Sequence, residues 1–111
     1  MLRFTSWFDL REEEVKANAP AGPAALQVRQ ARGLLEYPTG KSAMVWYGYA
    51  EESARGLLAE EFAEELREPG VGEHGPQQFR FMEGGEQSRE ALEIVWKRFE
   101  KRFGSPPVRN H

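Results

Sequence analysis

The stretch Ser42–Leu66, SAMVWYGYAEESARGLLAEEFAEEL, decides the fold because it places a strand directly before a helix. Five consecutive apolar residues, Ala43 to Tyr47, predict a strand from Ser42 to Gly48 that is covered on both faces. A helix is expected from Glu51 to Leu66, because apolar residues then recur at helical spacing. The residues of that apolar stripe are Ala54, Leu58, Phe62 and Leu66.

Arg55 is the anomaly in this helix. Its position projects into the same arc as the apolar stripe, and it lies in the first helical turn. A cation in the first turn is not stabilised by the dipole of its own helix. Two interpretations follow: the stem packs on the core while the guanidinium reaches water, or the guanidinium binds an anion.

Further elements are expected from periodicity and turn residues. They are a helix from Trp7 to Asn18, a strand from Pro23 to Arg29, a short extended segment at Leu34 to Tyr37, an edge strand from Gln77 to Met82, and a helix from Glu86 to Phe103 that Gly104 ends. This order predicts an α/β (α+β) fold with a small three-stranded mixed or antiparallel sheet flanked by helices. Residues 1–111 are expected to form one domain, with 1–20 as a helical lead-in and 104–111 as a tail.

Composition limits the function. The net charge of -3 argues against the broad basic surface of a protein that binds nucleic acid by bulk electrostatics, so any contact with DNA should be weak and local. The absence of cysteine excludes disulfides and thiolate metal sites. No stretch has the length and apolar content of a signal peptide or a membrane span, so a cytoplasmic protein without a membrane partner is expected.

The segment Pro38-Thr39-Gly40-Lys41-Ser42 is similar to the end of a phosphate-binding P-loop. That loop needs a glycine five residues before Gly40, where this chain has Leu35, and it should open a helix rather than a strand. A hairpin turn is therefore predicted here.

Arg55 and Glu93 form a stronger candidate pair. Glu93 lies at the edge of the apolar stripe of the last helix, so it could lean toward the sheet. If both helices pack beside the Trp46–Gly48 end of the strand, a guanidinium and a carboxylate would meet there. Arginine binds phosphate and a carboxylate binds magnesium or manganese, which together suit phosphodiester hydrolysis.

The order of motifs along nearly the whole chain resembles the GIY-YIG nuclease superfamily. Gly22–Leu26 takes the place of the first tripeptide, and Val45–Gly48 resembles the second. Arg55 matches the family's arginine, Glu93 matches its metal-binding glutamate, and Gly104–Asn110 is similar to the glycine, proline and asparagine that close many members. The resemblance implies that a tyrosine acts as general base, the arginine stabilises phosphate, and the glutamate holds one divalent metal.

Both signature tyrosines are replaced. Ala24 stands at the first position and Trp46 at the second, with Tyr47 one place later. A shift of one residue along a strand turns the side chain to the opposite face, so Tyr47 does not simply substitute, and Tyr49 is the other hydroxyl nearby. Loss of a general base typically lowers a rate by about two to four orders of magnitude.

The leading hypothesis is a degenerate GIY-YIG-like domain with little or no nuclease activity and a binding or structural role. The alternative is a divergent magnesium-dependent endonuclease that uses Arg55, Glu93 and either Tyr47 or Tyr49. A protein partner remains open, as does a homodimer that forms through the exposed strand Gln77–Met82.

Overall fold

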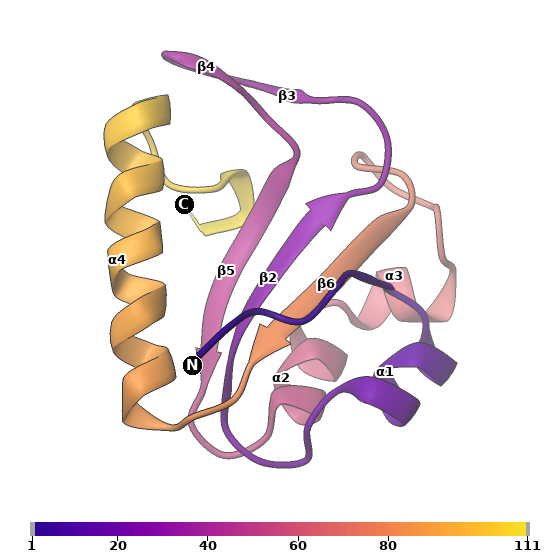
Figure 1. The fold of residues 1–111 in the computed structure, drawn as a ribbon. Helices are drawn as coiled ribbons and strands as arrows, with labels where there is room; N and C mark the ends of the chain where they lie inside the picture. Colours follow the sequence, from indigo (N-terminus) through magenta and orange to yellow (C-terminus); the bar gives the residue numbers. More distant parts are fainter. Residues whose placement is uncertain (1, 111) are drawn as a thin grey trace.

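The computed structural model describes residues 2–110 (Figure 1). The elements in chain order are β1 (Phe8–Asp9), α1 (Glu12–Asn18), β2 (Ala24–Gln30), β3 (Leu35–Tyr37), β4 (Gly40–Ser42), β5 (Met44–Ala50), α2 (Ala54–Glu61), α3 (Ala63–Arg67), β6 (Gln77–Met82), α4 (Glu86–Phe103) and the 3-10 helix η1 (Val108–Asn110). The predicted α+β class is confirmed.

The main sheet has four antiparallel strands in the order β1-β6-β2-β5, and β3 and β4 form a separate two-stranded ribbon. The prediction of a three-stranded sheet was therefore wrong in strand number. The ribbon confirms the hairpin turn predicted after Tyr37, since Tyr37 pairs with Gly40. Gly104, which ends α4, lies close against this turn. A Cβ added to Gly104 would be only 3.0 Å from the Cβ of Pro38.

The fourth strand comes from the segment expected to begin the first helix. Phe8 pairs with Phe79, and the amide of Leu10 donates to the carbonyl of Gln77, so these residues join the sheet and the helix begins only at Glu12. Strand β6 is consequently flanked by β1 and β2. Its predicted position at the edge of the sheet was wrong, and the proposed homodimer loses the edge on which it depended.

The two faces of the sheet carry separate cores. Strand β2 shows why, because successive side chains point to opposite faces and nearly all of them are buried. Leu26 and Val28 pack with α1 and α2, whereas Ala25 packs with α4. The helices that follow the strands therefore lie on opposite sides of the sheet, as Figure 1 shows for α2 and α4.

The predicted helix from Glu51 to Leu66 is two shorter helices. Ser53 begins α2 as its N-cap and accepts a hydrogen bond from the Gly56 amide at 3.0 Å. Phe62 separates α2 from α3 with φ -119° and ψ 33°, and its fully buried ring meets Trp46 edge-on at 5.4 Å. Burial of that ring ties the junction between α2 and α3 to the sheet.

Helix α4 matches the prediction at both ends. It runs from Glu86 to Phe103, and Gly104 ends it in the left-handed conformation at φ 80°. Leu92 and Phe99 are buried against the sheet. After α4 the chain returns to the exposed edge of β5, where Asn110 takes the place of a neighbouring strand.

Candidate functional site

The residues predicted for catalysis lie on different sides of the sheet. Tyr47 and Tyr49 belong to the core that α4 covers, and Glu93 lies on α4. Arg55 lies on α2, which packs against the other face. The structure therefore does not bring Arg55 and Glu93 together.

Arg55 is exposed, although Ala54 and Leu58 beside it are fully buried. Its Nε and Nη2 atoms donate to the carbonyl oxygen of Ala19 at 3.3 and 3.0 Å. Ala19 directly follows α1, so the guanidinium lies at the C-terminal end of a neighbouring helix, where a cation is stabilised. The expectation that Arg55 lies in the buried arc was wrong, and its reason for being in the first turn of α2 is this contact.

Glu93 lies on the exposed side of α4, in a shallow depression shared with Trp96, Lys97 and Glu100. The other carboxylate of this depression, Glu100, is two helical turns away, about 10 Å along the helix axis. Glu93 and Glu100 therefore cannot share one ion. Within residues 2–110 no three histidine or acidic side chains group as metal ligands. A magnesium or manganese ion at Glu93 would therefore have a single carboxylate ligand from this depression.

Tyr47 is almost completely buried, with 3% of its surface exposed, and its ring meets Trp96 and Phe99 edge-on at 6.0 and 5.6 Å. Burial raises the pKa of Tyr47 to about 12, and the positive charge of Arg80 only partly opposes that rise. The hydroxyl is therefore protonated at neutral pH, which is unfavourable for a general base.

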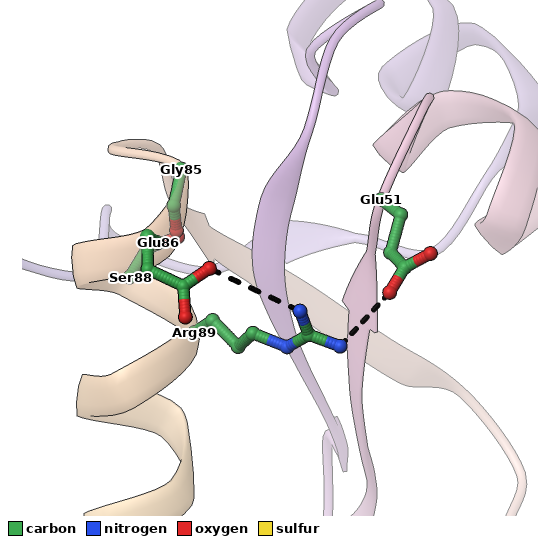
Figure 2. A network of polar contacts seen from close by, with 5 residues as sticks. All are labelled: Glu51, Gly85, Glu86, Ser88 and Arg89. Atoms are coloured by element: carbon green, nitrogen blue, oxygen red, sulfur yellow. Dashed lines mark hydrogen bonds and ion pairs between the residues drawn. The ribbon is translucent and has the colours of Figure 1, made fainter.

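Tyr49 is partly buried and lies under a different cation. The guanidinium carbon of Arg89 is 5.3 Å from the centre of its ring. Figure 2 shows Arg89 reaching from α4 to Glu51 beyond the end of β5, with a 2.8 Å contact, and a longer contact of 3.9 Å to Glu86. This network joins the start of α4 to the end of β5 and pairs the charge of Arg89 with carboxylates.

A different cluster, which was not predicted from the sequence, lies on the α4 side of the sheet next to Tyr47. Arg80 on β6, Gln27 on β2 and Tyr47 on β5 are cross-strand neighbours in one row. Arg29 lies in the next row, opposite Gln78. Four polar residues of these two strands, Gln27, Arg29, Gln78 and Arg80, therefore lie together on one face, whereas Gln30 and Gln77 pair on the other.

The N-terminal segment covers this arginine cluster, defined by Arg29 and Arg80. The guanidinium carbons of Arg29 and Arg80 lie 4.2 and 4.4 Å from the ring centre of Trp7, and Arg80 also lies 4.8 Å from that of Phe4. In Figure 1 the N-terminal segment crosses this side of the sheet before it reaches β6. The two cations and the indole thus form one stacked group.

Glutamine side chains hold both guanidiniums. The Nε atom of Arg80 donates to Gln27 Oε1 at 2.6 Å, and that of Arg29 donates to Gln78 Oε1 at 2.9 Å. Burial lowers the pKa of Arg80, Tyr47 opposes that change, and the like charge of Arg29 adds to it. A signal for the cluster was present in the sequence, since Gln27 and Arg29 alternate as Gln78 and Arg80 do.

No family model, curated protein or solved structure matches this chain. Over residues 2–110, no helix combines the length and the apolar content needed to cross a bilayer.

Proposed function

We propose that this chain is a GIY-YIG-like domain with little or no nuclease activity that serves a binding or structural role. One observation carries the proposal: the guanidinium of Arg55 is bound to the carbonyl of Ala19, on the side of the sheet away from Tyr47 and Glu93. The arginine expected to bind phosphate and the hydroxyl expected to activate water therefore have the sheet between them.

The distance between Arg55 and Tyr47 across the sheet is by itself too large for hydrolysis. A general base must lie within about 3 Å of the proton that it removes, directly or through one water molecule. A layer packed on a sheet lies about 10 Å from it, so a phosphate held at Arg55 is out of reach of Tyr47. The raised pKa of Tyr47 opposes the same step, because the neutral phenol must first lose a strongly held proton.

The relationship to the GIY-YIG superfamily is supported by the order of elements. The paired antiparallel strands β2 and β5 precede the helix that carries Arg55, and α4 carries Glu93. In the tail, Asn110 accepts a hydrogen bond from the Tyr47 amide at 3.0 Å and donates to the Tyr47 carbonyl at 2.8 Å. The motifs that carry the resemblance thus have structural roles that do not require catalysis.

Incubation with single-stranded, duplex and branched DNA in magnesium or manganese tests the proposal. Arg55→Ala is compared with Arg67→Ala, which removes an exposed arginine from α3. We expect no cleavage by any of the three proteins. Cleavage by the unmodified chain and by Arg67→Ala that disappears in Arg55→Ala would show a working nuclease and refute the proposal.

A further inference from the structure

We infer that Arg29 and Arg80 form a binding site for a phosphate group. The inference goes beyond the proposed function, because it uses neither Arg55 nor Glu93 and holds whether or not the chain descends from a nuclease. It rests on the arrangement of two guanidiniums around Trp7.

Each guanidinium is oriented by one hydrogen bond, but its other N–H donors are not used within residues 2–110. Each uses its Nε atom to bind one glutamine, as described above. Of the residues that the structure describes, none accepts a hydrogen bond from the terminal nitrogens of Arg29 or Arg80. Those nitrogens form the planar donor edge that binds phosphate oxygens in pairs.

The two charges are also uncompensated. Arg89 and Arg109 each contact a carboxylate, whereas neither Arg29 nor Arg80 forms an ion pair with any residue of the described range. Other arginines also lack an ion pair within residues 2–110, but those are exposed, whereas Arg29 and Arg80 are partly buried. Neutral glutamines occupy the cross-strand positions where glutamates would have neutralised both cations.

The positive charge of Arg80 is energetically unfavourable in this cluster. Burial and the nearby Arg29 both lower the pKa of Arg80, so its protonated form lacks full solvation and repels its neighbour. A bound anion would relieve both effects. Both arginine side chains remain partly exposed, so an anion can reach them from solvent.

Phosphate fits this site better than a carboxylate. A phosphate monoester carries between one and two negative charges at neutral pH, about -1.5 to -2, and three acceptor oxygens. Two guanidiniums supply two positive charges and donor edges for more than one oxygen. A carboxylate has a single charge and two oxygens, and would leave part of the cluster unpaired.

The first experiment titrates the full chain with inorganic phosphate at constant ionic strength, with sodium chloride as the compensating salt. Nuclear magnetic resonance follows the Nε–H signals of Arg29 and Arg80 and the indole N–H of Trp7. We expect saturable shifts of these signals and a rise in melting temperature with phosphate. Shifts that never saturate, or that chloride produces equally, would overturn the inference.

Variants then locate the binding. Arg29→Gln and Arg80→Gln should each weaken phosphate binding by about tenfold or more, since each removes one charged donor edge. Arg32→Gln, which changes an exposed arginine just after β2, should bind as the unmodified chain does. If Arg80→Gln fails to fold, Arg80→Lys takes its place, because it keeps a cation. Arg80→Lys should bind phosphate with intermediate affinity. Equal affinity in all variants would place the anion elsewhere.

Further arms identify the source of the phosphate group. Phenyl phosphate represents a small phosphomonoester, duplex DNA represents a nucleic-acid backbone, and acetate represents a carboxylate. Tighter binding of DNA than of phenyl phosphate through Arg29 and Arg80 would assign a polynucleotide phosphate, and the reverse order a small ester. Either result supports the phosphate site, whereas acetate binding as tightly as phosphate would refute it. Because none of these measurements follows cleavage, their failure is distinct from failure of the proposed function.

Discussion

The guanidinium of Arg55 joins two helices by donating two hydrogen bonds to the carbonyl oxygen of Ala19. The backbone strengthens the same junction, because the amide of Arg55 donates to Pro20 at 3.0 Å and that of Ala54 donates to Gly22 at 2.9 Å. Carbonyls of the segment that follows α1 thereby satisfy the first amides of α2. Arg55 has a structural role that accounts for its position without any ligand.

Replacement of Arg55 should consequently lower stability. Arg55→Ala removes a charged donor from an exposed site, so we expect a loss of about 1 kcal/mol in the free energy of unfolding. Arg55→Met keeps most of the stem and should show the same loss if the hydrogen bonds are responsible. Urea unfolding measures the difference, and an unchanged midpoint in both variants would contradict the assignment.

Gly48 should not tolerate a side chain. The indole of Trp46 lies across it, so a Cβ at Gly48 would lie 2.3 Å from two ring atoms. Since Trp46 is held against Phe62, Gly48→Ala should destabilise the fold by about 1 to 3 kcal/mol. Gly22→Ala is the matched control, because nothing lies within 4 Å of its added Cβ. Thermal unfolding that affects both variants equally would rule out the packing explanation.

Asn110 should protect the free edge of β5. Its amide group pairs with both the N–H and the C=O of Tyr47, so Asn110→Ala should leave both groups without this partner and lower stability by about 1 to 2 kcal/mol. Amide hydrogen exchange at Tyr47 should accelerate in this variant. Val108→Ala changes an exposed side chain in the same 3-10 helix and should leave that exchange rate unchanged.

Stability should fall at high pH because of Tyr47. Its pKa is raised from 10.0 to about 12 in the folded state, mainly by burial, so the folded protein favours the protonated phenol. The stabilisation is fully present below pH 10 and is lost as the pH rises to about 12, with a size on the order of 2 to 3 kcal/mol. Tyr47→Phe should reduce the slope of the stability curve over this range. An ordinary phenolate titration for Tyr47 would contradict the prediction.

Short-range patterns predicted several elements closely. The apolar stripe of α4 and the following Gly104 indicated both ends of that helix, because helical spacing and the left-handed cap are properties of adjacent residues. The continuous apolar run of β5 indicated a strand covered on both faces. The start of the chain was harder, since Phe8 and Asp9 form a strand only by pairing with β6, some 70 residues later in the chain.

By itself the sequence determined strands β2, β5 and β6, the hairpin turn and the last helix, since their signals lie within a few residues of one another. Only the tertiary structure decided which face of the sheet each helix covers, and so separated Arg55 from Glu93. It also joined Arg55 to Ala19 across 36 positions and placed Arg29 and Arg80 beside the same indole. The physical reason is that alternation along a strand assigns neighbours to opposite faces, while the layer packed on each face depends on contacts between distant segments.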